Sequence, residues 1–401
     1  MKNQDLHTKD QQFYLPTFKR IPLTFVKGAG SKLWDVEDKE YTDLLAGIAV
    51  NNVGHCHPKV VKAIQDQAAE LMHISNFFVS PAQVGLSELL VKISGLDRVF
   101  FTNSGAESVE GAIKIARRYA HSKGKGGKII SMQNSFHGRT LATIATGQPK
   151  YQEGFGPMPS GFVQVPFNDL EAIRKEIDEE VAAIILEPIQ GEGGIIPSDS
   201  NYLQSLKLLC EEHDIVLIFD EIQSGIGRTG QWFAKDLYGV QPDIMTLAKG
   251  LGGGMPIGAF LCNEKIASSI QYGDHGTTFG GNPMATAAAL ATLKVIVDEN
   301  LRQAAKQKGE WLKAKLNKLK NKFPVIQKVR GEGLMLGIVL EVPAIDVMQK
   351  LLKAGFITNA TAGNVLRIVP PLNIGYDALQ NFLNAFELVL IQQENEIHEQ
   401  S

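Results

Sequence analysis

Cysteine is scarce in this sequence, and its scarcity bears on both the fold and the compartment. The 401 residues include only three cysteines, Cys56, Cys210 and Cys262, which stand far apart in the chain. An odd and scattered set of this kind does not form the disulfide framework of a small secreted domain. We therefore expect a reducing environment and a cytoplasmic protein.

Long apolar runs and an excess of one charge are also missing. No stretch reaches the roughly 18 uninterrupted apolar residues of a membrane-spanning helix, and the opening MKNQDLHTKDQQFYLP has no apolar signal core. The formal net charge is −3, so nothing indicates a polyanionic partner. We expect neither a membrane nor a nucleic acid among the partners.

The sequence does contain an alternation of short apolar runs with helical periodicity, from about residue 75 to residue 295. Such alternation is typical of parallel strands joined by crossover helices. The predicted strands are 99–102, 128–131, 182–187, 216–220, 244–247 and 258–262. From about residue 300 the pattern changes to a long charged helix, strands such as 333–340 and 365–369, and a final helix.

This change of pattern predicts an α/β protein with two domains. Residues 1–60 are predicted to form an irregular arm with short strands, for example 31–38, that completes part of the small domain. Residues 61–298 are predicted to form the large domain, and residues 299–401 a smaller α+β domain.

Small residues open the helix predicted to follow strand 99–102. Ser104, Gly105 and Ala106 precede apolar residues at helical spacing, and Glu107 lies in the first turn. Backbone N–H groups at such a helix start can bind a phosphate. An ordinary helix cap explains the same residues, so this segment alone leaves both interpretations open.

Two acidic residues, Asp220 and Glu221, end the apolar strand 216–220. This is the edge of a parallel sheet at which ligands bind. Paired acids there can hold a divalent metal beside a phosphate, but the phosphate-loop signature GxxxxGK[ST] is missing from the sequence, which weakens that interpretation. The alternative is a carboxylate that pairs with the protonated ring nitrogen of a cofactor.

Lys249 follows an apolar run and enters the glycine-rich turn KGLGGG. An arbitrary lysine is a solvated surface residue. At a sheet edge it would be partly desolvated, and such a lysine suits Schiff-base chemistry. Lys249 also lies 29 residues after Asp220, so one crossover unit would place both at neighbouring strand ends.

The cluster His55–Cys56–His57 resembles a set of metal ligands. The spacing is too tight for one chelating set, and no second cluster of histidine and cysteine follows. We interpret it as a structural turn before a helix and expect no metal.

Seven segments together resemble the class III (ornithine-type) aminotransferases, which have fold type I. They are NSGAE (103–107), SFHGRT (135–140), EPIQGEGG (187–194), FDEIQSGIGRTG (219–230), LAKGLGGGMPIG (247–258), HGTTFGGNP (275–283) and VLRIVPPLNI (365–374). The resemblance covers nearly the whole chain, in the order and spacing of the family. It implies a mostly parallel seven-stranded sheet in the large domain and pyridoxal 5′-phosphate as cofactor.

The resemblance also implies roles for single residues around the cofactor. Lys249 would carry the cofactor covalently and act as the acid and base, while Asp220 would pair with the ring nitrogen. The remaining cofactor contacts would be Gln223 at the phenolic oxygen, Phe136 on a ring face, Gly105 and Ala106 at the phosphate, and Thr278 at the phosphate of a neighbouring subunit. The last contact implies a homodimer with active sites at the subunit interface.

Two substrates would share one pocket in such an enzyme. Arg139 would hold the distant carboxylate of an ω-amino donor, and Arg367 the α-carboxylate of 2-oxoglutarate. Glu192 would mask Arg367 while the donor is bound. Thr277 matches a further position that touches substrate.

Within the family the likeness is greatest to enzymes that take N2-acetyl-L-ornithine as donor in arginine biosynthesis. Ile48 stands where enzymes for free ornithine carry a tyrosine, and Val109 departs from the usual GAEANE motif without expected effect. Succinylornithine, succinyl-diaminopimelate, ornithine and 4-aminobutyrate remain alternative donors. An aminomutase, a decarboxylase or a non-catalytic regulator of the same fold is disfavoured by the arginine pair and by the intact Lys249 and Asp220.

Overall fold

A seven-stranded sheet forms the centre of the computed structural model, which describes residues 2–400, with side chains described as far as residue 394. The strand order is β4-β12-β11-β10-β7-β5-β6. In that order the strands are Arg98–Thr102, Gly258–Cys262, Ile244–Leu247, Val216–Asp220, Val181–Leu186, Lys128–Met132 and Phe162–Val165. The predicted fold class is confirmed, and β6 is a short strand at the sheet's edge that the apolar pattern did not reveal.

One strand runs against the prediction of parallel pairing. β12 pairs antiparallel with both β11 and β4. Only residues 248–257 join β11 to β12, and this is too short for the crossover helix that a parallel neighbour requires. The short connection contains Lys249 and the glycine-rich turn.

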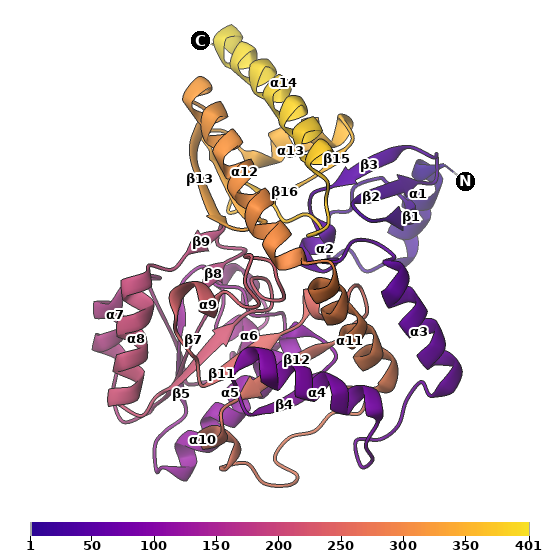
Figure 1. Ribbon diagram of the computed structural model, residues 1–401. Coiled ribbons are helices and arrows are strands. Elements are labelled where there is room, and N and C mark those ends of the chain that lie inside the picture. Colours follow the sequence, from indigo (N-terminus) through magenta and orange to yellow (C-terminus); the bar gives the residue numbers. More distant parts are fainter. Residues whose placement is uncertain (1, 401) are drawn as a thin grey trace.

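Helices cover both faces of the sheet (Figure 1). Helix α5 (Gly105–Ser122) packs on one face, and α8 (Ser200–Glu212), with α7 (Leu170–Glu176) beside it, packs on the other. Alternate side chains of β10 serve the two faces: Ile218 lies in the cluster with α5, and Phe219 in the cluster with α8. Because both faces are buried, the strand is apolar from Val216 to Phe219, up to its final residue.

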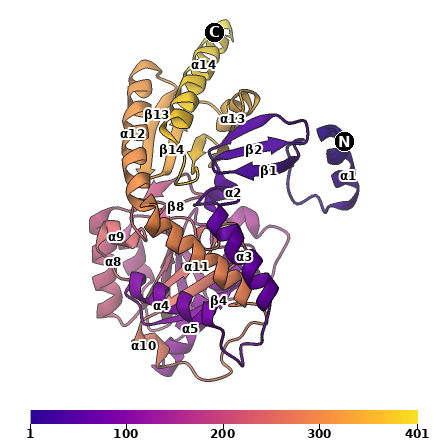
Figure 2. The same ribbon diagram turned by 45° about the vertical axis from the view of Figure 1, so that its right-hand side comes forward.

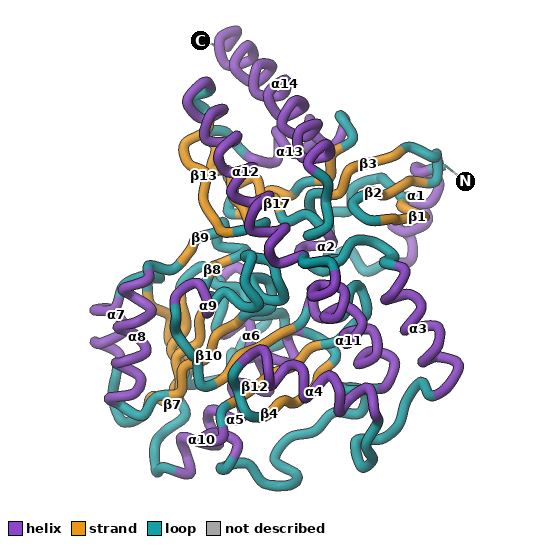
Figure 3. Tube along the Cα trace, viewed as in Figure 1, coloured by secondary structure: helices purple, strands orange, loops and turns teal. Residues whose placement is uncertain are grey.

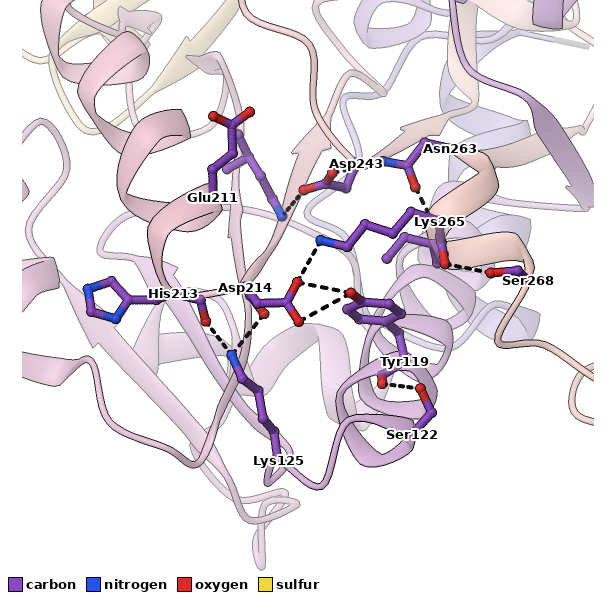
Figure 4. A network of polar contacts seen from close by, with 12 residues as sticks. Tyr119, Ser122, Lys125, Glu211, His213, Asp214, Asp243, Asn263, Lys265 and Ser268 are labelled. Carbon is purple, nitrogen blue, oxygen red and sulfur yellow. Dashed lines mark hydrogen bonds and ion pairs between the residues drawn. The ribbon is translucent and has the colours of Figure 1, made fainter.

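The far end of α5 is tied to the sheet by a polar network around Asp214 (Figure 4). The Tyr119 hydroxyl donates to Asp214 Oδ1 at 2.9 Å, and Lys265 Nζ lies 2.6 Å from the same oxygen. Lys125 Nζ donates to the Asp214 carbonyl oxygen at 2.9 Å. These contacts fix the helix whose opposite end, at Gly105, faces the sheet edge described below.

The C-terminal part forms a second layer around the sheet β13-β14-β17-β16. Its strands are Ile326–Glu332, Met335–Leu340, Val365–Ile368 and Asn359–Thr361, and its helices are α12 (Leu301–Lys322), α13 (Ala344–Lys353) and α14 (Tyr376–Gln400). In Figure 1, α12 and α14 rise above the large sheet. The buried faces of these elements join one large apolar cluster with α11 (Pro283–Asp298).

The N-terminal strands associate with this C-terminal part. β1 (Phe25–Ala29), β2 (Lys32–Asp35) and β3 (Glu40–Asp43) form a sheet with β15 (Phe356–Ile357), which pairs parallel with β3. The expectation of an irregular arm was wrong for the first residues, because Asn3–Phe13 form helix α1. Helix α1 buries no side chain, so its sequence has no periodic pattern of apolar residues from which a helix could be predicted. Figure 2 shows α1 at the outer edge, beside β1 and β2.

The remaining elements are short or peripheral. They are α2 (Ala46–Ala49), α3 (Pro58–Glu70), α4 (Pro81–Ser94), α6 (Leu141–Ala145), α9 (Lys235–Tyr238), α10 (Glu264–Ala267), β8 (Ile189–Gln190), β9 (Ile196–Pro197), and the 3-10 segments η1 (Pro149–Tyr151) and η2 (Lys249–Leu251). Loops gather between the large sheet and the C-terminal layer (Figure 3). Among the described residues, no helix combines the length and apolarity needed to cross a membrane.

Candidate active site

A cavity of about 340 Å³ lies at the carboxyl ends of the central strands. This is the edge at which open α/β sheets bind their ligands. The lining residues follow five different strands: 103–106 after β4, 136–138 after β5, Glu187 after β7, Asp220 with 222–223 at β10, and 248–249 after β11. Of the predicted cofactor residues, all but Thr278 line this cavity.

Lys249 lies in a strained turn on the cavity wall. Its φ of 41° falls in the left-handed region that few side chains adopt, and such strain is common at functional sites. Burial lowers the pKa of the Lys249 amine; the charge of Glu192 opposes this and that of Arg367 adds to it. The next residue, Gly250, faces Asn52 so closely that a Cβ would lie 2.3 Å from the amide nitrogen. The turn is therefore packed against a fixed side chain.

Asp220 is buried and holds three hydrogen bonds. Its Oδ2 lies 2.7 Å from His137 Nδ1, and its Oδ1 accepts from the Thr246 hydroxyl at 3.1 Å and the Ile222 N–H at 3.0 Å. His137 is also buried, and burial opposes its charged form. The hydrogen bond and charge of Asp220 outweigh that effect and raise the pKa of His137. Sequence reasoning missed His137, although it lies inside the SFHGRT motif.

The start of α5 lines the same cavity. The Ser104 hydroxyl caps the helix by accepting from the Glu107 N–H at 3.2 Å. The N–H groups of Gly105 and Ala106, in the first turn, have no acceptor within the helix. A Cβ on Gly105 would meet Ile222 at 2.9 Å, so a larger residue would displace the wall. This geometry leaves backbone donors at the cavity, as the phosphate interpretation requires.

Arg367 is almost fully buried and forms an ion pair with Glu192. Its Nη2 donates to Asn359 Oδ1 at 2.6 Å, and its Nη1 donates to Gln223 Oε1 at 3.3 Å. Burial opposes the charge on Glu192, but the charge and hydrogen bond of Arg367 hold its pKa below the usual range. The Thr361 hydroxyl donates to the Glu192 carbonyl oxygen at 2.8 Å. Gln223 thus connects this pair to the cavity.

Arg139 is exposed and, unlike the neighbouring residues 136–138, does not line the cavity. Its guanidinium lies over the ring of Tyr151, 4.0 Å from the centroid, and 5.6 Å from the centroid of Phe136. Among the described residues Arg139 has no ion pair, which leaves its charge available to a ligand. Tyr151 is a contact that the sequence gave no reason to select.

The two predicted threonines lie on the loop before α11, outside the cavity wall. The Thr277 hydroxyl accepts from Asn103 Nδ2 at 3.4 Å, and Asn103 lines the cavity. Thr278 is exposed and does not line the cavity of its own chain.

The segment that contains Ile48 is a turn of left-handed backbone. Ala46, Gly47, Ile48 and Ala49 all have φ between 52° and 66°. For a β-branched residue such as Ile48 this conformation is rare and strained. Val50, directly after the turn, lines the cavity, whereas Ile48 does not.

The histidines of the VGHCHP segment pair with different carboxylates. His55 Nε2 lies 2.6 Å from Asp43 Oδ2, and His57 Nε2 lies 3.0 Å from Glu299 Oε1. His57 is also the residue before α3. Within the described part of the chain, no three His, Cys, Asp or Glu side chains are grouped closely enough to hold a metal ion.

The cavity residues fit the expected pyridoxal phosphate in their chemistry. An amine with a lowered pKa, a buried hydrogen-bonded carboxylate and the free N–H groups of a helix start all face one cavity. These groups match an aldehyde carbon, a protonated ring nitrogen and a phosphate, respectively.

Comparisons with known proteins agree with this geometry. The family model for class III aminotransferases matches residues 14–390. The chain is 50% identical to the acetylornithine aminotransferase of Methanocaldococcus jannaschii, over 96% of this chain and 97% of that protein. The solved ornithine aminotransferase of Toxoplasma gondii superposes with a TM-score of 0.95 at 33% identity, covering 99% of this chain and 96% of that one. The solved acetylornithine aminotransferase of Elizabethkingia anophelis gives a TM-score of 0.87 at 34% identity, covering 98% and 100%. The chain belongs to the class III aminotransferases, which depend on pyridoxal phosphate.

Proposed function

We propose that this aminotransferase moves the terminal amine of N2-acetyl-L-ornithine to 2-oxoglutarate. The products are N-acetyl-L-glutamate 5-semialdehyde and L-glutamate, and the reaction belongs to arginine biosynthesis. The observation that carries the proposal is the buried Arg367–Glu192 pair beside the Lys249 cavity, in a chain half identical to an acetylornithine aminotransferase. Only 2-oxoglutarate has a carboxylate beside the reacting carbon. A site that takes both substrates therefore needs a second cation, Arg367, that Glu192 neutralises while the donor is bound.

The cofactor-facing residues divide the chemistry between them. Lys249 would hold the cofactor and, once its amine is free, would take a proton at Nζ from the substrate carbon and deliver it to the cofactor carbon; its lowered pKa makes the neutral base accessible. Bound pyridoxal phosphate supplies an electron sink. Asp220, oriented by His137, keeps the ring nitrogen protonated. The other proposed contacts are Phe136 at a ring face, Gln223 at the phenolic oxygen, and Gly105 and Ala106 at the phosphate.

Substrate selection rests on two arginines with different surroundings. Exposed Arg139 holds the far carboxylate of either substrate, and Thr277 contacts Asn103 on the cavity wall. Buried Arg367 binds the α-carboxylate of 2-oxoglutarate only after Glu192 leaves it. Arginine suits both tasks because its planar fork binds a carboxylate through two N–H groups.

The proposal includes a homodimer, with Thr278 directed to the cofactor phosphate of the second subunit. Thr278 lies beside Phe279, which is 60% exposed, and Asn76 Nδ2 binds the Thr277 carbonyl oxygen at 3.1 Å. That bond brings the segment Phe77–Val79 next to the same loop. The three side chains of this segment are 63–94% exposed. Exposed apolar side chains gathered in this way indicate a subunit contact.

The division into an arm (1–60), a large domain (61–298) and a small domain (299–401) is part of the same proposal. So is a cytoplasmic location, which the three free cysteines support.

Half-reactions with a panel of donors test the substrate. The purified holoenzyme is mixed with acetylornithine, succinylornithine, succinyl-diaminopimelate, ornithine or 4-aminobutyrate, and the absorbance of the bound cofactor is followed. We expect the highest kcat/KM with acetylornithine. Free ornithine is the alternative that the likeness to ornithine aminotransferases favours. The family resemblance at Ile48 argues against it, although Ile48 itself does not line the cavity. A higher kcat/KM with any other donor of the panel would overturn the assignment to acetylornithine.

A further inference from the structure

Glu187 is a buried carboxylate at the cavity with no role in the reaction described above. It follows β7 directly and is 5% exposed. Its Oε2 accepts from the Phe136 N–H at 3.1 Å, and its Oε1 accepts from the Gly191 N–H at 3.0 Å. One side chain therefore binds the backbone of two segments that are far apart in the sequence.

These two segments, the loop 133–137 and the turn 190–193, also contact each other directly. Gln190 Nε2 donates to the Gln133 carbonyl oxygen at 2.8 Å. A Cβ on Gly193 would lie 3.0 Å from the Asn134 carbonyl oxygen, so the backbones approach closely. The loop contains Phe136, and the turn contains Glu192.

We propose that Glu187 is a positioning residue that fixes loop 133–137 and turn 190–193 relative to each other. It thereby sets both the ring-facing position of Phe136 and the resting position of Glu192 beside Arg367. This inference rests on the proposed roles of Phe136 and Glu192. The contact of Phe136 with the cofactor ring and the pairing of Glu192 with Arg367 would then both depend on the Glu187 carboxylate.

Only a carboxylate offers an acceptor to each of the two N–H groups. In Glu187→Gln one of them would face an amide NH₂, donor against donor. Burial raises the pKa of Glu187 to about 7, with the charge of His137 opposing and that of Asp220 adding to the shift. The amine of Lys249 also senses the charge of Glu187. The two hydrogen bonds of Glu187, to the Phe136 and Gly191 N–H groups, form a clamp between the loop and the turn. This clamp should loosen as the pH falls below about 7, because the protonated acid loses one acceptor.

Glu221 provides a matched control. It is fully buried, and burial raises its pKa to about 7 as well. Its carboxylate also accepts from two backbone N–H groups, those of Ala234 at 2.9 Å and Lys235 at 2.7 Å. It does not line the cavity. Glu221→Gln thus repeats the same chemical change without touching loop 133–137 or turn 190–193.

The experiment compares the wild-type, Glu187→Gln and Glu221→Gln holoenzymes. Backbone hydrogen exchange should speed up at Phe136 and Gly191 in the first variant, and at Ala234 and Lys235 in the second. The visible circular dichroism of bound pyridoxal phosphate should change only in Glu187→Gln. In that variant the dissociation constant of L-glutamate should shift about ten- to a hundredfold, the range of one lost hydrogen bond to a charged group. In Glu221→Gln it should stay within about twofold.

Equal effects of the two variants on the dichroism and on glutamate binding would overturn the proposal, because Glu187 would then be an ordinary buried acid. Should Glu187→Gln not fold, Glu187→Asp keeps the charge and is too short to reach both N–H groups. Glu187→Asp should then show smaller changes in hydrogen exchange, dichroism and glutamate binding. If these changes are absent, the proposal is wrong. If the wild-type enzyme does not accept acetylornithine, the proposed function is wrong. The dichroism and hydrogen-exchange results would still test the positioning role of Glu187.

Discussion

Replacing Glu192 with glutamine should make the enzyme bind glutamate more tightly. In the resting site Glu192 occupies Arg367 Nη1, the donor that binds the α-carboxylate of glutamate in the function proposed above. The glutamate carboxylate must therefore displace the Glu192 carboxylate before it binds. Glutamine keeps the length of the side chain and removes the charge, so this competition weakens.

The surroundings of Arg367 make the variant interpretable. The Arg367 side chain is 1% exposed and keeps its bonds to Asn359 and Gln223, at 2.6 and 3.3 Å, whichever residue stands at 192. The Glu192 side chain is 22% exposed, so the substitution opens no large hole. The variant should fold, and the buried cation should stay in place.

The size of the effect follows from the lost ion pair. A charge-assisted hydrogen bond contributes about 1.5–3 kcal/mol, which corresponds to a decrease of roughly ten- to a hundredfold in the dissociation constant of glutamate. Because the pKa of Glu192 is held below its usual range, the wild-type residue stays ionised at neutral pH and the difference persists there. Discrimination against attack at the α-amine of free ornithine should weaken as well.

Single-turnover absorbance with each substrate measures the effect, with the two arginines as reference variants. Arg367→Ala should slow the glutamate half-reaction much more than the acetylornithine half, whereas Arg139→Ala should slow both. The proposal that Glu192 leaves Arg367 when glutamate binds is wrong if wild type and Glu192→Gln have the same affinity for glutamate. It is also wrong if Arg367→Ala slows both half-reactions equally. The aminotransferase activity would survive that result.

Three further predictions concern the cofactor, the assembly and the pH dependence of stability. Asp220→Ala should retain some cofactor and lose several powers of ten in the rate of proton abstraction; near-normal turnover in stopped-flow would show that another group protonates the ring. Active species should be dimers or larger, since Thr278 does not line the cavity of its own chain, and an active monomer in light scattering at assay concentration contradicts this. Because the folded-state pKa of Glu221 is raised from 4.5 to about 7, its stabilising contribution is complete below pH 4.5 and is lost as the pH rises through 7. Urea unfolding should therefore show Glu221→Gln gaining up to about 3 kcal/mol relative to wild type between pH 4.5 and 8, and a constant difference would refute the assignment.

The sequence predicted the strand ends well because apolar runs and their polar stops are local features. Asp220 and Lys249 illustrate this: a spacing of one crossover unit placed them on neighbouring strands, and β10 and β11 do pair in parallel, with Asp220 opposite Thr246. The predicted sheet is mostly parallel, as observed, but the apolar pattern did not reveal that β12 is the reversed strand, because pairing direction depends on the length of a connection rather than on apolarity.

Contacts between distant segments could not be predicted in the same way. His137 bonds to Asp220 at the end of β10, and Glu187 bonds to Phe136 on the loop after β5; neither bond leaves a local pattern in the sequence. The position of Arg139 over Tyr151 likewise depends on how the segment 133–151, which includes α6 and η1, folds back, and no spacing rule predicts this. Helix α1 has no buried face, so periodicity gave no signal for it.

The central claim is that Lys249 holds the cofactor. Borohydride reduction of the holoenzyme, followed by proteolysis and peptide mapping, tests it directly, because reduction fixes pyridoxal phosphate on the lysine that carries it. The account predicts the label on Lys249, in the peptide that contains LAKGLGGG. A label on any other lysine, with Lys249 unmodified, would contradict it.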